Sequence, residues 1–402
     1  MTGAGRDGAP AREPLWIFCR VIDNFGDAGV GWRLARELAA EHGFEVTLII
    51  DDAATLAQIE PRLIVHGRPE GAWQIAGIRI VARRLLDEPA DVERVGLPRL
   101  PAVIVSAFGC DLPDWLRSRL AGGPRRPLWI HLEYLSAEPW IESCHGLVSV
   151  KPADTAREHF FYPGFTPASG GLLREARLEA RRQVFEDEGG RDVWLERLGA
   201  GAPRGRRVVS LFCYPAAPVA GWLGLIARGL DRTLVLAAGT AADAAIEAHF
   251  GWLPEVGAHA RDGQLELMRL PMLSQDDYDR LLWSCEVNFV RGEDSWIRAH
   301  WARAPFIWQA YPQPDAAHQA KVEAFLARMQ ADQSDSAGLA PAVALFRAWN
   351  GLDADPGALP QAWAAFTQSL DSLRQGYSLW AATLARQPDL AANLARYCRD
   401  RI

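Results

Sequence analysis

The chain has 402 residues and a formal net charge of −7, with 49% hydrophobic and 23% charged residues. A chain of this length can form two domains and can bury about three quarters of its unfolded surface, so it needs no disulfide or metal staples. The acidic balance argues against a general nucleic-acid-binding surface, and we expect no nucleic acid among the partners.

The cysteines and the apolar runs indicate the cellular compartment in which the protein works. The six cysteines are scattered and include no C-x-x-C pair, which argues against a zinc site or a disulfide framework and is typical of a reducing environment. No apolar run precedes Leu15 and none is long enough to cross a bilayer. We therefore expect a cytoplasmic protein without a membrane partner. Residues 1–12, rich in Gly, Ala and Arg, are predicted to be a disordered tail.

The first half of the chain alternates apolar runs with helix-like segments. Continuous apolar runs bounded by loops are typical of a parallel sheet that helices cover on both faces. Amphipathic stretches at 30–40 and 112–120 predict two of the covering helices. The predicted strands are 15–19, 46–50, 78–81, 102–106, 128–131 and 147–150.

A turn-rich segment at 162–171 interrupts this alternation, and a charged helical stretch follows it to about residue 197. The run 199–205 has the composition of a linker. A second alternating series begins at Arg207, and from about Pro341 the chain is mostly helix-like. The predicted strands of this half are 208–212, 234–238, 265–268, 287–290 and 306–308, and its predicted helices are 219–229, 275–283, 295–302 and 316–329.

The two series predict an α/β fold with two Rossmann-like, doubly wound domains that face each other across a cleft, and a helical C-terminal tail. We place the first domain at 13–198 and the second at 206–402. Dehydrogenases and glycosyltransferases share such a build, so architecture alone assigns no function. Open α/β sheets bind ligands at the carboxyl ends of their strands, and the candidate residues are therefore those that follow strands.

The loop after the first predicted strand carries two aspartates, Asp23 and Asp27, before a helix opens near Val30. Two carboxylates at a strand end can anchor a cationic group and accept a proton from it. The structural alternative makes Asp27 a helix N-cap and Asp23 an Asx-turn residue, since aspartate favours both places. Capping explains one carboxylate and leaves the other unexplained. The residues predicted to position this loop are Asn24, Phe25, Gly26 and Gly29.

The glycines of the same loop also suggest a dinucleotide site. Gly26, Gly29 and Gly31 precede Asp51 or Asp52, an acid about 20 residues on, as in dinucleotide-binding folds. The order is G-x-x-G-x-G rather than G-x-G-x-x-G, and an acid inside the loop would repel a pyrophosphate. An NAD-dependent oxidoreductase is therefore a weaker, alternative hypothesis.

A second candidate group follows the apolar run 287–290 and opens a helix: Arg291, Gly292, Glu293, Asp294 and Ser295. Arginine beside a helix N-terminus suits a phosphate, because the guanidinium and the free backbone N–H groups both donate to it. Ser295 can cap that helix and also donate to the phosphate. The alternatives are an ordinary charged turn, or a metal held by the two acids. No D-x-D lies beside them, and we expect no metal.

Aromatic and methionine side chains of the second half form a candidate site for a nucleobase and a sugar. Phe212 and Tyr214 follow one predicted strand, and Met272, Gln275 and Tyr278 follow another. Aromatic and methionine faces can sandwich a pyrimidine, and glutamine can hydrogen-bond its edge. Core packing or a helix start explains each residue alone as well. The site hypothesis is stronger for the group than for any one residue, because both segments lie at the carboxyl ends of strands in the second half of the chain.

At these residues the chain resembles the EarP family of bacterial elongation factor P arginine rhamnosyltransferases. The matching blocks span most of the chain in order, which makes the resemblance specific. They are 21–30, 32–36, 132–138, 210–214, 291–295 and 311–313, and they include the sequences DNFGD and RGEDS.

The resemblance implies a GT-B glycosyltransferase that moves L-rhamnose from TDP-β-L-rhamnose to one arginine of elongation factor P and inverts the anomeric carbon. It implies acceptor binding by the first domain, donor binding by the second, and no metal or other cofactor. By position, Asp27 would be the general base, Asp23 an acceptor-orienting carboxylate and Glu293 a third carboxylate of the catalytic set. The implied donor-binding residues are Phe212, Tyr214, Met272, Gln275, Tyr278, Arg291, Gly292, Glu293, Asp294 and Ser295.

The chain departs from the family pattern at two places. Met272 stands where the family often has an aromatic residue beside the base, with Tyr278 the next candidate for stacking. After Tyr214, residues 215–217 read Pro-Ala-Ala, so the resemblance does not assign the donor contacts of that loop. A third hypothesis is a non-catalytic protein that binds a translation factor and carries a decayed sugar site.

Overall fold

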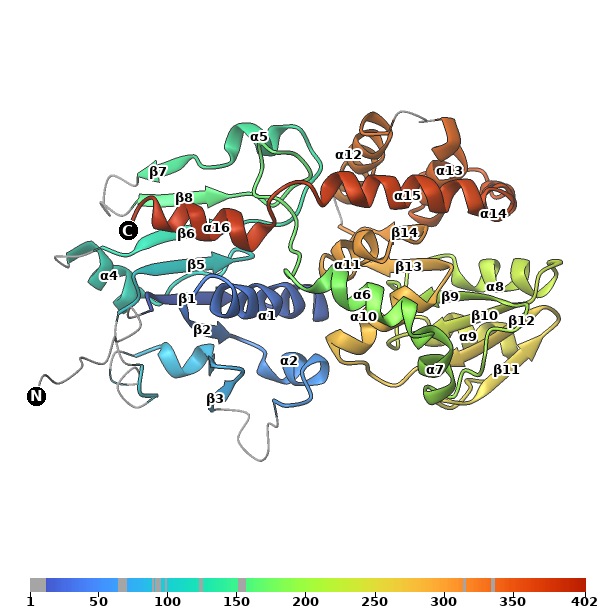
Figure 1. Ribbon diagram of the computed structural model, residues 1–402, viewed down its shortest axis with the longest axis horizontal. Coiled ribbons are helices and arrows are strands. Elements are labelled where there is room, and N and C mark those ends of the chain that lie inside the picture. The colour runs from blue at the N-terminus through green and yellow to red at the C-terminus, as the bar shows by residue number, and fades with distance from the viewer. Residues whose placement is uncertain are drawn as a thin grey trace, which may run out of the picture.

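The computed structural model describes residues 12–63, 71–88, 90, 95–97, 100–122, 126–150, 157–313, 316–333 and 337–402. Two α/β units lie side by side in it (Figure 1). The predicted tail, 1–12, lies outside the described residues except for Arg12, whose guanidinium donates to the carbonyl of Ala39 at 3.4 Å. Within the described ranges, no helix has both the length and the apolar character that crossing a bilayer requires.

An eight-stranded sheet forms the centre of the first unit, in the order β3-β4-β2-β1-β5-β6-β8-β7. Its inner strands run parallel, whereas β3 and β7 pair antiparallel at the two edges. All six predicted strands are present, but the one at 147–150 is an antiparallel edge strand rather than a parallel one, and β3 and β8 were not predicted. The strands are β1 (Pro14–Cys19), β2 (Glu45–Ile50), β3 (Ala72–Ile75), β4 (Ile78–Ala82), β5 (Val103–Ala107), β6 (Leu128–Leu132), β7 (Val148–Val150) and β8 (Arg157–Phe161).

Helices bury both faces of this sheet, as its apolar strands require. Alternate side chains of β1 enter different clusters: Ile17 packs with residues of α1 (Phe25–Ala40), and Trp16 packs with Leu116 of α4 (Asp114–Gly122). Among the described residues as far as β8, the other helices are α2 (Ala53–Ile59), the 3₁₀ turn η1 (Arg83–Leu86) and α5 (Trp140–Cys144).

The second unit is built on a six-stranded sheet in the order β11-β12-β10-β9-β13-β14, with only β11 antiparallel. The five predicted strands of this half are confirmed within a residue or so at each end, and β11 was not predicted. The strands are β9 (Arg207–Leu211), β10 (Thr233–Ala237), β11 (His259–Asp262), β12 (Leu265–Arg269), β13 (Val287–Arg291) and β14 (Phe306–Gln309). The helices between them are α8 (Val219–Ala227), α9 (Asp243–Phe250), α10 (Gln275–Ser284) and α11 (Asp294–Ala302).

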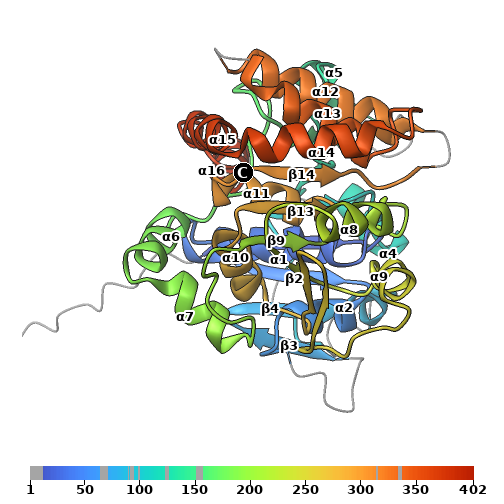
Figure 2. The ribbon, with the colours of Figure 1, turned by 90° about the vertical axis from the view of Figure 1, so that its right-hand side faces the viewer.

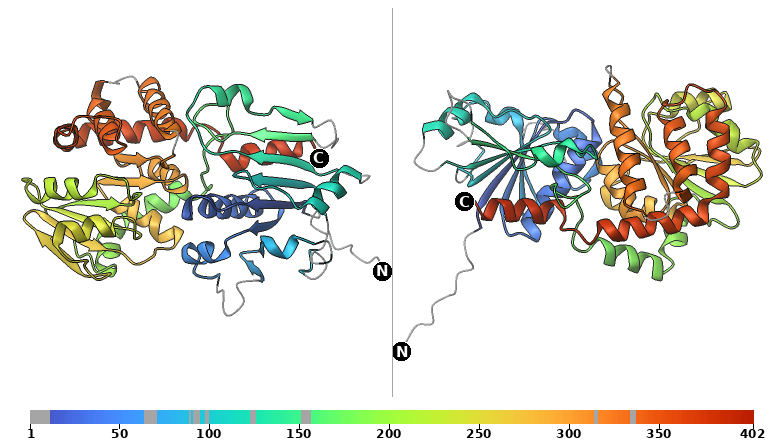
Figure 3. Two further views of the ribbon diagram at one scale, coloured as in Figure 1. Left: turned by 180° about the vertical axis from the view of Figure 1, so that it is seen from behind. Right: turned by 90° about the horizontal axis from the view of Figure 1, so that it is seen from above.

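Helices that follow β14 gather on one side of the second sheet (Figure 2). They are α12 (Ala317–Ala331), the short η2 (Ala337–Leu339), α13 (Ala340–Trp349), α14 (Ala358–Gln368) and α15 (Leu370–Leu384). The last helix, α16 (Leu390–Arg399), instead crosses back to the first unit (Figure 3). There Leu390 N–H donates to the carbonyl of Leu172 at 3.0 Å and the Arg399 guanidinium donates to the carbonyl of His42 at 2.6 Å.

The helices before the linker cross in the opposite direction. α6 (Leu178–Asp187) and α7 (Gly190–Arg197) pack against α10 of the second unit. Trp194 and Leu195 are buried in a cluster with Val208 of β9. The packing therefore crosses the boundary expected between 13–198 and 206–402: α6 and α7 pack against α10 of the second unit, and α16 packs against α1 of the first.

Candidate active site

The helix that follows β1 begins earlier than the sequence indicated. Asn24 is the N-cap residue of α1, so Asp27 lies in the first turn of the helix rather than in a loop before it. Asn24 has φ 46° and ψ −115° and makes no side-chain cap. Its amide oxygen instead accepts a hydrogen bond from the Thr55 hydroxyl at 3.3 Å. The alternative in which Asp27 caps the helix is therefore wrong.

Asp27 is a buried carboxylate with one oxygen free. Its Oδ2 accepts hydrogen bonds from the backbone N–H groups of Ile22 at 2.7 Å and Asp23 at 2.8 Å. Its Oδ1 is buried and has no hydrogen-bond partner among the described residues. Burial raises the pKa of Asp27 to about 6, and the nearby Asp23 and Asp51 carboxylates act in the same direction. Such a carboxyl is suited to accept a proton near neutral pH.

Asp23 lies where the two units meet. Its Oδ2 accepts a hydrogen bond of 2.5 Å from the hydroxyl of Tyr214, which follows β9 of the second unit. Burial raises the pKa of Asp23, although Tyr214 and Arg291 both act to lower it. Gly292 has φ +62°, and a Cβ there would stand 2.5 Å from Asp23 Oδ2. Glycine is therefore required for this approach of the second unit to Asp23.

The turn between β13 and α11 presents Arg291 between two aromatic rings. The guanidinium carbon lies 4.5 Å from the ring centroids of both Phe212 and Tyr214, a cation–π arrangement on two sides. Ser295 Oγ accepts from the Arg291 N–H at 3.2 Å and donates to the Arg291 carbonyl. Ser295 therefore holds the turn and is not the expected helix cap, because Glu293 occupies the N-cap position.

Two acids and a glutamine of the second unit reach toward the first. Glu293 Oε2 accepts from the backbone N–H of Leu135 at 2.9 Å, while its Oε1 is buried without a hydrogen-bond partner among the described residues. Burial raises the pKa of Glu293 to about 8. Asp294 Oδ1 accepts from Arg33 Nε at 2.9 Å, and Gln275 Nε2 donates to the carbonyl of Gly29 at 3.0 Å. All three side chains are thus engaged between the units.

A pocket opens between the units beside these residues. The predicted residues that line it are Asp23, Phe25, Gly26, Phe212, Met272, Gln275, Tyr278, Arg291, Gly292, Asp294 and Ser295. The predicted residues outside its lining are Asn24, Asp27, Gly29, Tyr214 and Glu293. The lining also includes residues that sequence reasoning missed: Ile59, Ala238, Gly239, Pro271 and Leu273. Gly239 could have been found, because it follows a predicted strand of the second half.

The two candidates for stacking on a base occupy different parts of the pocket. Met272 is 44% exposed, so it lies at the rim. The ring of Tyr278 lies edge-on to that of Phe212, with centroids 5.8 Å apart. Tyr311, from the loop after β14, stands edge-on to Tyr214 at 5.3 Å; residues 314 and 315 of that loop lie outside the described residues.

The glycines of the first loop pack against protein rather than leaving room for a pyrophosphate. A Cβ on Gly29 would stand 2.9 Å from Asp294 Oδ2, and one on Gly31 would stand 3.0 Å from Cys19 Sγ. The close approach of α1 to α11 therefore explains why residue 29 is glycine, and the packing of α1 on β1 explains why residue 31 is glycine. The geometry gives the dinucleotide hypothesis no support.

Two doubly wound sheets whose strand ends face one another across a pocket are the build of the GT-B class of glycosyltransferase. The model of the EarP family, described as elongation factor P (EF-P) rhamnosyltransferase, matches residues 15–399. The chain belongs to this family and is a glycosyltransferase.

The relatives agree with this assignment. The chain is 42% identical to a protein-arginine rhamnosyltransferase of Pseudomonas putida over 393 residues, which are 96% of this chain and 98% of the relative. It is 39% identical to a protein-arginine rhamnosyltransferase of Pseudomonas aeruginosa, with the same coverage. A solved structure described as the structural basis for EarP-mediated arginine glycosylation of translation elongation factor EF-P has a TM-score of 0.64 and 32% identity, covering 97% of this chain and all of the other.

Proposed function

We propose that the protein transfers L-rhamnose from TDP-β-L-rhamnose to an arginine side chain of elongation factor P, with inversion at the anomeric carbon. The family description and the names of the relatives support rhamnosyl transfer to a protein arginine. The observation that carries the proposal is Asp27, a buried carboxylate of raised pKa with one unpartnered oxygen, beside an interlobe pocket. An enzyme that modifies a translation factor would act in the cytoplasm.

The acceptor chemistry explains why the first unit carries carboxylates. A guanidinium is protonated at neutral pH and has no free lone pair, so it is a poor nucleophile until a proton leaves. In the proposed mechanism Asp27 Oδ1 takes that proton as a guanidinium nitrogen bonds to the anomeric carbon. Asp23 would hold the guanidinium by a charge-assisted hydrogen bond, and the unpartnered oxygen of Glu293 would help to orient it.

The donor would bind to the second unit. Arg291 and the first residues of α11 line the pocket. There they would donate hydrogen bonds to a bound diphosphate and would stabilise the charge that grows on it as the glycosidic bond breaks. Phe212 and Tyr278 offer aromatic faces for a pyrimidine, and Met272 at the rim can cover it. Inversion requires base and leaving group on opposite sides of the sugar, which fits their origin in different units. None of these steps needs a metal or another cofactor.

Intact-mass measurement of elongation factor P after incubation with the enzyme and TDP-β-L-rhamnose tests the proposal. We expect a mass increase of one deoxyhexosyl group, which peptide fragmentation assigns to a single arginine. An acceptor with that arginine changed to lysine should stay unmodified, because its ammonium offers no guanidinium nitrogen. Binding of the donor without any adduct would instead support the non-catalytic hypothesis, and no binding of either substrate would refute both.

The rate should depend on pH through Asp27. The base acts only when it is deprotonated, so kcat/KM should rise with pH through a midpoint near 6 and level off above it. The variant Glu293→Gln should keep this midpoint, because the pKa of Glu293, about 8, leaves that carboxyl neutral across the acid limb. A midpoint near 4, the ordinary value for aspartate, would show that burial does not tune the base.

A further inference from the structure

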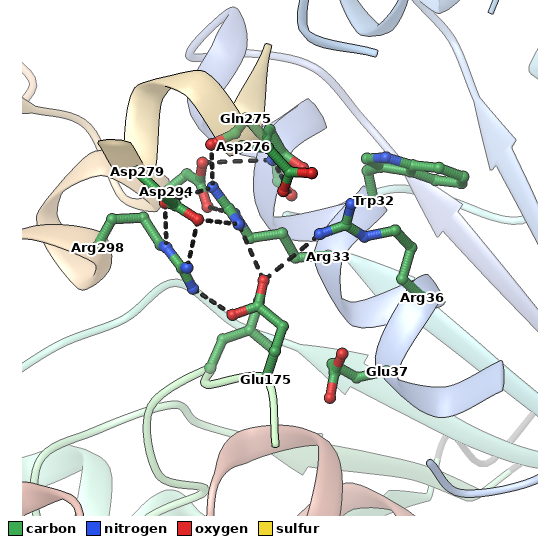
Figure 4. Close-up of polar contacts among 12 residues, drawn as sticks. Trp32, Arg33, Arg36, Glu37, Glu175, Gln275, Asp276, Asp279, Asp294 and Arg298 are labelled. Atoms are coloured by element: carbon green, nitrogen blue, oxygen red, sulfur yellow. Dashed lines mark hydrogen bonds and ion pairs between the residues drawn. The ribbon is translucent and has the colours of Figure 1, made fainter. Parts of the chain in front are cut away.

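Four buried charged side chains and the partly exposed Asp294 form one network near the place where the chain passes from the first unit to the second (Figure 4). Its members come from α1, from the crossing segment before α6, and from α10 and α11. They are Arg33, Glu175, Asp279, Asp294 and Arg298. Charged groups are rarely this buried unless they are paired, so the network has a structural or functional cause.

The members outside α1 form an acidic socket. Arg298 Nε and Nη2 donate to the two oxygens of Asp279 at 2.8 and 2.7 Å, and its Nη1 donates to Glu175 Oε2. The third carboxylate of the acidic socket is Asp294, one helical turn before Arg298 on α11, so the acidic socket combines three carboxylates with one arginine. With each carboxylate ionised, the acidic socket carries an excess of two negative charges.

Arg33 of α1 fills the acidic socket. It is 0% exposed, and its guanidinium meets all three carboxylates: Nη1 lies 2.9 Å from Glu175, Nη2 lies 3.2 Å from Asp279, and Nε lies 2.9 Å from Asp294. Arg36, one helical turn on, adds an outer contact of 3.5 Å to Glu175. These two arginines balance the two excess negative charges, so α1 and the acidic socket are complementary in charge.

The contact between Arg33 and Asp294 links this network to the pocket. Asp294 lines the pocket and opens α11, while its Oδ1 is held by Arg33 from the other unit. Its Oδ2 accepts a hydrogen bond from Gln275 Nε2 at 3.4 Å. A planar guanidinium that is held by three carboxylates fixes the direction of each of them, which a flexible ammonium cannot do.

We propose that Arg33 is a positioning residue for the transfer: by filling the acidic socket it sets how α1 and α11 approach each other and orients the Asp294 carboxylate toward the donor sugar. The proposal rests on the proposed function, because it needs a sugar donor in the pocket. Arg33 itself touches neither substrate. Its effect on the donor is transmitted by Asp294, and this separates it from a residue that merely stabilises the fold.

A double-mutant cycle on donor affinity tests this inference. TDP-β-L-rhamnose is titrated calorimetrically into the full chain carrying Arg33→Lys, Asp294→Asn or both. We expect each single change to weaken donor binding by about tenfold. The double variant should bind the donor as well as the weaker-binding single variant does, because Arg33 acts only through Asp294. Effects that multiply to about a hundredfold, or an unchanged affinity in Arg33→Lys, would overturn the inference.

Steady-state kinetics and a matched control separate positioning from stability. The loss in Arg33→Lys should appear in KM for the donor, with KM for the acceptor protein unchanged. Arg206→Lys is the control, because the Arg206 side chain is only 10% exposed and pairs with Glu266 on a part of the second unit away from the pocket. This control should keep the wild-type donor affinity, and an equal loss in it would point to general destabilisation and overturn the inference.

Gly29→Ala tests the Asp294 step on which the inference depends if Arg33→Lys does not fold. The added Cβ would stand 2.9 Å from Asp294 Oδ2 and leaves every charge of the network in place. It should weaken donor binding by displacing Asp294, and an unchanged affinity would overturn the inference. A wild-type chain that fails to bind the donor would refute the proposed function instead, which keeps the two failures distinct.

Discussion

Asp27→Asn should lower kcat by about 10²–10⁴-fold, the range over which a positioned general base acts, while the affinity for TDP-β-L-rhamnose stays within about twofold. Asparagine has the same shape, and its amide oxygen can accept both N–H groups that now bond to Oδ2. The amide cannot accept the proton of the arginine. Single-turnover transfer and donor calorimetry on the same preparation measure the two quantities, and near-normal turnover would contradict the assignment of the base.

The same substitution should make the protein more stable at alkaline pH. The pKa of Asp27 in the folded protein is raised from 3.8 to about 6, so the folded state favours the neutral carboxyl. The free energy of unfolding therefore falls as the pH rises from 3.8 to about 6. Above pH 6 the folded protein bears the full cost of a buried, ionised Asp27. Removing the charge should recover roughly 3 kcal/mol at pH 8 and little at pH 4.

Denaturant unfolding of both proteins at pH 4 and pH 8 measures this difference. Asp231→Asn is a suitable control, because Asp231 is exposed and pairs with Arg207 at the surface, where such pairs contribute little. Equal stability of wild type and Asp27→Asn at pH 8 would show that Asp27 is solvated. A gain in stability with a loss of turnover is the signature of a group held in a costly state for catalysis.

The fold could be predicted where strands are buried on both faces. Runs such as 15–19 and 46–50 are uninterrupted and apolar, and such runs have few alternatives. The missed strands lack this signal. β3 and β11 are antiparallel edge strands with exposed positions, and β8 begins with Arg157 and Glu158. Their pairing is decided by partners elsewhere in the chain, which a local pattern does not show.

The candidate site could be predicted to the same extent. Asp23 follows the buried strand β1 of the first sheet and Arg291 ends the buried strand β13 of the second. Such strand ends are where open α/β sheets bind ligands, so the sequence could point to both residues but not to their meeting. The start of α1 could not be predicted, because it depends on the unusual backbone of Asn24. Contacts such as Arg33 to Asp294 join residues 261 positions apart and leave no local pattern. For that reason the roles of Glu293, Asp294 and Gln275 between the units emerge only from the structure.

Arg291→Ala should reduce kcat by about 10²–10³-fold, the loss that follows removal of one donor to a developing anion. Arg291 ends β13 beside the pocket, and the flanking rings of Phe212 and Tyr214 hold its guanidinium plane. Its charge would offset the one that grows on the departing TDP. Because that charge is larger in the transition state than in the bound donor, the loss should exceed the weakening of donor binding.

Arg291→Lys should recover little of this loss. An ammonium on a flexible stem cannot stack between two rings and cannot donate in a bidentate manner to a diphosphate. Arg280→Ala on α10 is the matched control, since that arginine is half-exposed and pairs with Asp277 on its own helix. Rapid-quench measurement of the first turnover, with the affinity for TDP measured separately, resolves the two effects. A loss confined to TDP affinity, with the chemical step unchanged, would make Arg291 a binding residue only and would assign leaving-group stabilisation to the N-terminus of α11 alone.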